Sequence, residues 1–107
     1  MFKRKQRLSR KDFENILKKG TRVQNEYLSL LHEDETETKV GVVVSKKNAN
    51  KATQRNKLRR IIFSVLKDNE RYLNKKHVAV FLKKNSSKMT FSEIERELTT
   101  LLKKHLK

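Results

Sequence analysis

The chain has 107 residues and a mass of 12.8 kDa. This length is typical of one compact domain, so we expect a single domain over residues 1–107. The chain carries 28 lysines and arginines against 12 aspartates and glutamates, a formal net charge of +16 at pH 7. Such a charge repels itself unless a polyanion neutralises it, and the composition therefore favours a nucleic-acid partner.

The absence of cysteine excludes several classes of protein. Disulfide scaffolds, zinc fingers, iron–sulfur proteins and thiol enzymes all need this residue. The longest apolar run, Val78–Leu82, is too short to span a bilayer, and the basic first residues precede no apolar stretch of the signal-peptide type. We therefore expect a cytoplasmic protein with no membrane partner.

The first predicted element is a helix that begins after Ser9 and ends at Gly20. Ser9 and Asp12 have the spacing of a capping box, and Leu8 is placed to form a hydrophobic staple. Gly20 is expected to end the helix in the left-handed conformation. The apolar face of this helix is formed by Phe13, Ile16 and Leu17.

Two strands are predicted next. The first covers Val23–His32, and the second contains the alternating residues Val40, Val42 and Val44. The linker over residues 33–37 holds four of the twelve acids. It is interpreted as a solvated hairpin loop that points away from a polyanionic ligand.

A second helix is predicted over Thr53–Lys67, followed by a strand around Val78–Leu82 and a last helix. Thr90 and Glu93 form a capping box for the last helix, with Met89 and Ile94 as a staple. The order helix, two strands, helix, strand, helix indicates an α/β sandwich in which helices cover a small sheet. The apolar stripe of the second helix consists of Leu58, Ile61, Ile62, Val65 and Leu66.

The charge is concentrated in one part of the chain. Residues 38–67 contain nine cations and no acid. On a helical projection, Asn56, Arg60 and Lys67 lie opposite the apolar stripe, with Arg59 beside them. Arginine binds phosphate through two parallel hydrogen bonds, and asparagine can both donate to and accept from a sugar or base, so this face is interpreted as a nucleic-acid surface. The alternative is a merely solvated basic face.

Phe63 projects onto the same outward basic face. Two interpretations stay open: it stacks on a base or ribose, or it is an ordinary exposed or partly covered aromatic.

No catalytic or metal-binding pattern is present. His32, His77 and His105 lack ligand spacing, and the glutamates at 93, 95 and 97 point in different directions on a helix. A chain with two glycines has no glycine-rich phosphate loop. We therefore expect no catalytic residue, no metal site and no cofactor bound by this chain alone.

One stretch of sequence resembles a known family. Residues 41–47 read GVVVSKK and residues 51–60 read KATQRNKLRR, which resembles the signature of the bacterial ribonuclease P protein component. The opening with Leu8, Phe13 and Gly20 and the closing amphipathic helix come in the same order as in the family. The resemblance implies an α/β (α+β) two-layer sandwich like domain 2 of ribosomal protein S5, with a left-handed strand–helix–strand crossover.

The resemblance also implies a function. The chain would be the protein subunit of an endoribonuclease that removes the 5′ leader of precursor tRNA, in a 1:1 complex with ribonuclease P RNA. Catalysis and Mg²⁺ would reside in that RNA. The residues implied to bind the catalytic RNA are Lys46, Lys47, Lys51, Arg55, Asn56, Lys57, Arg59 and Arg60. Those implied to bind the leader are Phe13, Leu17 and Leu31, of which the two leucines replace residues that are often aromatic in the family.

Two other functions are compatible with a small basic domain. The first is a non-catalytic structural RNA-binding protein of the ribosomal type. The second is a DNA-binding module that reads the major groove with its basic helix, although no helix-turn-helix partner is recognisable.

Overall fold

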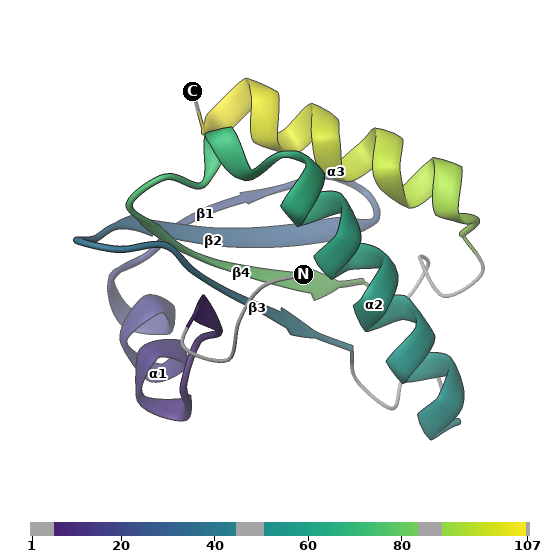
Figure 1. The fold of residues 1–107 in the computed structure, drawn as a ribbon, viewed down its shortest axis with the longest axis horizontal. Coiled ribbons are helices and arrows are strands. Elements are labelled where there is room, and N and C mark those ends of the chain that lie inside the picture. Colours follow the sequence, from purple (N-terminus) through teal and green to yellow (C-terminus); the bar gives the residue numbers. More distant parts are fainter. Residues whose placement is uncertain (1–5, 45–50, 84–88, 107) are drawn as a thin grey trace.

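The computed structural model describes residues 6–44, 51–83 and 89–106. It confirms a mixed α/β fold with three α-helices and a four-stranded sheet (Figure 1). Lys46 and Lys47, both predicted to bind RNA, lie outside the described residues. In chain order the elements are α1 (Arg10–Lys19), β1 (Thr21–Gln24), β2 (Leu28–Asp34), β3 (Lys39–Val43), α2 (Ala52–Asp68), the short 3₁₀ helix η2 (Glu70–Tyr72), β4 (Lys76–Leu82) and α3 (Phe91–His105).

The predicted strand over Val23–His32 is wrong, because the chain turns within it. The side-chain oxygen of Asn25 accepts hydrogen bonds from the backbone N–H groups of Tyr27 and Leu28, each at 2.8 Å. An asparagine that bonds to the backbone two residues onward is a turn-forming device. It divides the segment into β1 and β2, which pair as an antiparallel hairpin.

The predicted hairpin between β2 and β3 is also wrong. The order in the sheet is β1-β2-β4-β3, so β4 lies between them. β4 is antiparallel to β2 and parallel to β3. The acidic linker therefore joins two strands that are not neighbours, an arrangement that local sequence cannot indicate.

The connection from β3 through α2 to β4 has the handedness that the resemblance implied. In Figure 1 both strands point the same way and β4 lies above β3, while α2 passes in front of them. This crossover is left-handed, whereas such connections are almost always right-handed.

The two faces of the sheet are covered differently. α2 and α3 pack on one face, against a large core that includes Leu30, Val40 and Val80. α1 packs on the other face through Ile16, which contacts a smaller cluster with Leu31 and Ala79. Because side chains alternate along each strand, consecutive residues of β2, β3 and β4 serve the two cores in turn.

The predicted helix starts are confirmed for α1 and α3. Ser9 with Asp12, and Thr90 with Glu93, each form both hydrogen bonds of a capping box. The left-handed conformation predicted for Gly20 is wrong: its φ is −69° and its ψ is 152°. The backbone is extended there because β1 begins at the next residue.

No helix in the described ranges is long and apolar enough to cross a membrane.

Candidate nucleic-acid interface

The outward face of α2 brings together the predicted basic residues. Asn56 and Arg60 are exposed and Arg59 is half-buried. Together with Arg7 and the edge of Phe63, they line an open hollow of about 400 Å³. We call these three α2 residues and Arg7 the α2 basic surface. Of the other α2 residues predicted to bind RNA, Lys57 is exposed and Arg55 is half-buried, and Lys51, just before the helix, is exposed.

Arg7 reaches this surface because the segment before α1 joins the edge of the sheet. Arg7 forms a parallel bridge with Val40 of β3, and the N–H of Leu8 donates to the Val40 carbonyl at 2.8 Å. As on a strand, the two side chains then point to opposite faces. Leu8 enters the smaller core, and the Arg7 guanidinium lies 5.0 Å from the centroid of the Phe63 ring.

Sequence reasoning missed Arg7, because it lies outside any periodic segment. The available signal was its position directly before Leu8, the staple residue of α1. An apolar residue that faces one core turns its predecessor to the opposite side whenever the chain there is extended.

Phe63 lies beside the predicted basic residues and lines the same hollow, but the expected exposure is wrong. The residue is 9% exposed and belongs to the large core. A helical projection around α2 assigns residues to a face but does not show which neighbours cover that face. The segment carrying Arg7 covers Phe63, so the ring supports the arginine by a cation–π contact.

Asn56 is oriented by its neighbour on the helix. The Asn56 side-chain oxygen accepts a hydrogen bond from Arg59 Nη2. The two residues are three apart and thus adjacent on the surface of α2. This bond joins the asparagine and the arginine as one hydrogen-bonded pair on the outward face of α2.

The N-terminus of α2 adds to the positive field of this surface. Among the residues that the structure describes there is no side-chain cap on this helix, whose N-cap residue is Lys51, and its first turn holds no acid. The first backbone N–H groups of a helix carry a partial positive charge, which favours an anion such as phosphate. The geometry of the α2 basic surface can therefore bind a phosphate chain.

Two cations of the acid-free segment serve the fold instead. Lys67, predicted to lie with Asn56 and Arg60, forms an ion pair with Glu70 at 2.8 Å. Lys39 lies 3.5 Å from a carboxylate oxygen of Asp12. The backbone N–H of Ser9 bonds to the same carboxylate and is the main reason why the pKa of Asp12 is lowered.

The residues predicted to bind the leader have different exposures. Leu17 is 57% exposed and Phe13 is half-buried on the same face of α1. Leu31 is 3% exposed and packs beneath α1, so it offers little surface to a ligand.

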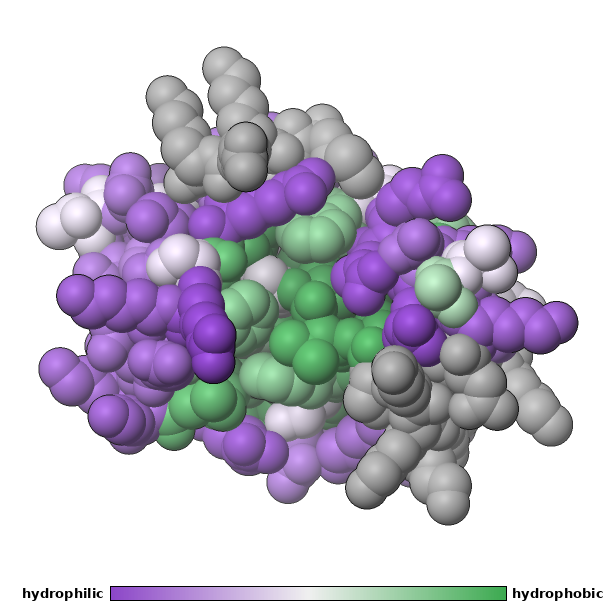
Figure 2. Space-filling view, turned by 90° about the horizontal axis from the view of Figure 1, so that it is seen from below, coloured by the Kyte–Doolittle hydropathy of each residue, from purple (hydrophilic) through white to green (hydrophobic). Residues whose placement is uncertain are grey.

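Two residues of the sheet complete the apolar surface beside α1. Val43 of β3 and Phe81 of β4 are register partners on the face that α1 covers in part. We call Phe13, Leu17, Val43 and Phe81 the apolar patch. Figure 2 shows apolar atoms gathered in the middle of this face, with hydrophilic surface on both sides. Sequence reasoning missed Phe81, although its alternation with Val80 and Leu82 indicated the opposite face.

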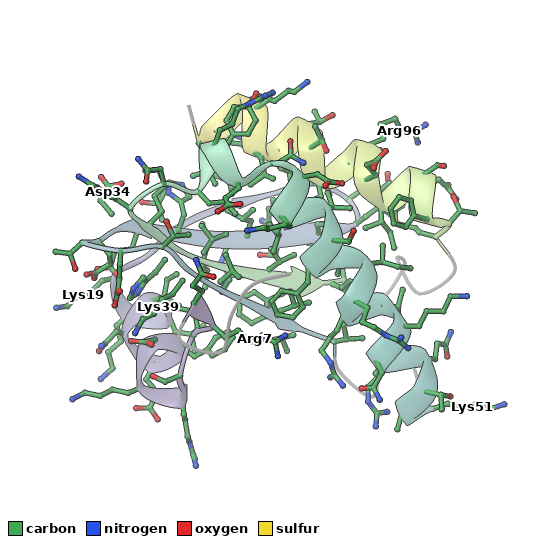
Figure 3. All side chains as sticks on the ribbon, in the orientation of Figure 1. Arg7, Lys19, Asp34, Lys39, Lys51 and Arg96 are labelled. Atoms are coloured by element: carbon green, nitrogen blue, oxygen red, sulfur yellow. The ribbon has the colours of Figure 1, made fainter. Side chains whose placement is uncertain are left out.

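The acidic segment around Asp34 lies at the other end of the molecule from the first turn of α2. Figure 3 places Asp34 and Lys51 at opposite ends of the molecule. Asp34 forms an ion pair with Lys76 of β4, and this pairing lowers the pKa of Asp34.

In the part of the chain that the structure describes, no three His, Asp or Glu side chains come close enough together to hold a metal ion. The chemistry available at the α2 basic surface is therefore that of cationic and hydrogen-bonding contacts.

Comparisons with known proteins agree with this geometry. Residues 2–106 match the family model described as Ribonuclease P. The ribonuclease P protein component of Thermotoga sp. strain RQ2 is 34% identical, over 96% of this chain and 94% of the relative. The corresponding protein of Bacillus velezensis is 30% identical, over 97% and 91%.

Solved structures show the same fold. The RNase P protein of Staphylococcus aureus superimposes with a TM-score of 0.83 at 27% identity, over 92% of this chain and 93% of that one. The RNase P protein of Thermotoga maritima gives a TM-score of 0.82 at 32% identity, over 92% and 96%.

Proposed function

Because the chain belongs to the ribonuclease P protein family, we propose that it is the protein subunit of a ribonucleoprotein that forms the mature 5′ end of tRNA. It binds the catalytic RNA as a 1:1 complex and also contacts the 5′ leader of precursor tRNA. The observation that carries this proposal is the α2 basic surface, where three arginines and an asparagine surround one open hollow.

The RNA-binding role follows from the chemistry of that surface. Guanidinium groups bind phosphate with two parallel hydrogen bonds, and they keep their charge at any physiological pH. The lining residues of the hollow include no acid. We assign the contacts to Asn56, Arg59, Arg60 and Arg7, with Lys51, Arg55 and Lys57 along the same helix. Lys46 and Lys47 belong to the proposal through the family motif alone.

The apolar patch suits an unpaired leader. Single-stranded RNA exposes base faces that stack on aromatic rings or lie against apolar side chains. Phe13 and Phe81 supply such rings, while Leu17 supplies apolar contact. We propose that the leader crosses this patch and that Leu31 acts from below, by supporting α1 through the smaller core.

The proposal assigns cleavage, and the magnesium ions that it needs, to the RNA subunit. The contribution of this chain is binding: it neutralises phosphates of the catalytic RNA and positions the leader. Each phosphate contact releases counterions, so affinity should depend steeply on salt.

Reconstitution tests the proposal. The purified chain and a bacterial ribonuclease P RNA are mixed at low magnesium, and release of the leader from precursor tRNA is measured. We expect cleavage by the complex and none by the chain alone. Arg60→Ala should weaken binding of the catalytic RNA by ~1–3 kcal/mol. Phe13→Leu should weaken the binding of precursor tRNA more than it weakens the binding of a tRNA that lacks the leader.

Arg96→Ala is the matched control, because Arg96 is an exposed arginine of α3, away from the α2 basic surface. Arg96→Ala should change neither the affinity for the catalytic RNA nor the affinity for precursor tRNA. If the chain binds the RNA but never stimulates cleavage, the proposed role is wrong. If Arg60→Ala and Arg96→Ala have equal effects, the assignment of the surface is wrong.

A further inference from the structure

A second basic surface lies where the C-terminal ends of α2 and α3 meet. Five residues line an open hollow of about 770 Å³ there: Arg71, Tyr72, Thr100, Lys103 and Lys104. We call them the C-terminal patch. α2 has 17 residues and is therefore about 25 Å long. Figure 1 shows its first turn and the end of α3 at opposite sides of the molecule, so this patch is separate from the first turn of α2.

The patch contains an arginine–tyrosine pair in cation–π contact. The Arg71 guanidinium lies 4.8 Å from the centroid of the Tyr72 ring, and Arg71 Nη2 donates to the Tyr72 hydroxyl at 3.1 Å. The ring is half-buried and packs against the large core, whereas Arg71 is exposed. The ring thus holds the guanidinium plane in place, and RNA-binding proteins use such planes to stack unpaired bases.

The lysines of the patch have a simpler explanation that must be considered. Cations in the last turn of a helix stabilise its negative dipole end, and Lys103 and Lys104 lie in the last turn of α3. Arg71 likewise lies in the last turn of η2, just after α2, but its guanidinium contacts the Tyr72 ring, which the helix dipole does not require. The dipole also does not account for a hollow lined by three cations and no carboxylate.

The ion pairs formed in the described ranges include none of Arg71, Lys103 and Lys104. Lys103 also borders a neighbouring hollow that contains Asp68 and Glu95. A test of the C-terminal patch therefore replaces Lys104 and not Lys103, which also borders the second hollow.

We propose that the C-terminal patch is a second RNA-contacting site, which takes one unpaired nucleotide of a single-stranded segment. The base stacks on the Arg71–Tyr72 pair, and the neighbouring phosphates contact Lys103 and Lys104. A positive charge alone would attract any polyanion, but the Arg71–Tyr72 pair beside it favours RNA with an accessible base.

Binding of the full chain to a labelled single-stranded oligouridylate of roughly 10 nucleotides tests this site. The measurements use an Arg59→Ala/Arg60→Ala background, which weakens the α2 basic surface. In that background Arg71→Gln/Lys104→Gln should lower the affinity on the order of 10-fold. It should also reduce the slope of log affinity against log salt by roughly 0.7 for each lost phosphate contact.

The matched control is Lys11→Gln/Arg96→Gln, which removes the same charge from exposed residues of α1 and α3. It should change the affinity less than twofold. Thermal unfolding of each variant shows whether the fold is retained. If both double variants lower the affinity equally, net charge explains the binding and the site does not exist.

Inorganic polyphosphate of similar charge is the second probe. The patch variant should lose more affinity for the oligouridylate than for polyphosphate, because only the RNA has bases to stack. Equal losses would overturn the assignment of the Arg71–Tyr72 pair. Catalytic RNA and precursor tRNA are absent from both measurements, so a failure of this site would leave the function proposed above standing.

Discussion

At Gly41 the backbone of β3 lies directly beneath the ring of Phe13. A Cβ atom built on Gly41 would lie 2.3 Å from Phe13 Cζ and 3.1 Å from a methyl group of Leu8. The missing side chain therefore lets α1 approach the sheet and sets the position of Phe13 in the apolar patch. At this residue the requirement is space, because Gly41 does not have a positive φ.

Gly41→Ala should lower the free energy of unfolding by about 1–3 kcal/mol, the usual cost of overpacking a core. Urea denaturation measures the change. A smaller Phe13 side chain should relieve the clash, so the same substitution should cost less in a Phe13→Leu background. An equal cost in both backgrounds would show that Phe13 is not the obstacle.

His32 makes stability depend on pH. Burial is the main reason why the pKa of His32 is lowered, and the nearby Lys76 lowers it further. The unfolded chain therefore binds a proton at this residue more readily than the folded chain. Its contribution to stability is complete above about pH 6.5, the ordinary value for histidine, and is lost as the pH falls through the lower pKa of the folded state.

His32→Gln should consequently reduce the fall in stability between about pH 7.5 and pH 5. Urea denaturation of both proteins at a series of pH values gives the comparison. The difference between their free energies of unfolding should change with pH in this range. If the free energies of unfolding of the two proteins differ by the same amount at every pH, the pKa of His32 is not lowered in the folded chain.

Among the elements, α2 differs from the other two helices at its N-terminus. α1 and α3 each begin with a complete capping box, whereas the side chain of Lys51, the N-cap residue of α2, forms no capping hydrogen bond. Lys51 already has the extended backbone of an N-cap residue, with φ −87° and ψ 135°. We propose that the first N–H groups of this helix, with their positive dipole end, bind phosphate.

Lys51→Asp should therefore have opposite effects on stability and on binding. An aspartate at this position can cap the helix and complement its dipole, which should stabilise the chain by about 0.5–1 kcal/mol. The same carboxylate should repel the catalytic RNA and weaken its binding. Urea denaturation and RNA titration check the two effects. A more stable variant that binds RNA with unchanged affinity would remove the first turn of α2 from the interface.

At the scale of the whole molecule, the net charge of +16 is unevenly distributed. The acidic loop occupies the end of the molecule away from Lys51 (Figure 3). Ion pairs in the described ranges use cations mainly outside the α2 basic surface, such as Lys39, Lys67 and Lys76. The chain alone therefore carries a self-repulsion that an RNA partner relieves.

Salt should act in opposite directions on the chain alone and on its complex. Raising the ionic strength from about 0.05 M to about 0.5 M shortens the screening length several-fold. The Tm of the chain alone should rise because repulsion among its cations is screened, while the affinity for catalytic RNA should fall steeply. Calorimetry and RNA titration over the same salt series test this. A Tm that falls with salt would mean that attractive ion pairs outweigh the repulsion.

Much of the local structure could be predicted because local chemistry produces it. The capping boxes at Ser9 and Thr90 set two helix starts, since the partners are three residues apart. The hairpin expected between β2 and β3 failed because a distant strand, β4, lies between them, whereas two other errors are local. Asn25 ends β1 by a turn that was not recognised, and Gly20 is extended because the next strand follows at once.

In the candidate site, some residues could be placed from the sequence and others could not. Asn56, Arg59 and Arg60 were predicted to share a face because helix periodicity alone brings them together. Arg7 and Phe63 were not placed correctly, because their positions depend on an N-terminal segment pairing with β3. No pattern along the chain indicates that pairing.

By itself the sequence determined the three helices, the capping boxes of α1 and α3, the basic face of α2 and a polyanion as the class of partner, because each depends on charge or on contacts within a few residues. Only the tertiary structure decided which strands are neighbours, which side of α2 is covered, and how Val43 and Phe81 join α1 in one patch. These features depend on contacts between segments distant in the chain, and the free energy of burying their apolar surfaces together selects one arrangement among many.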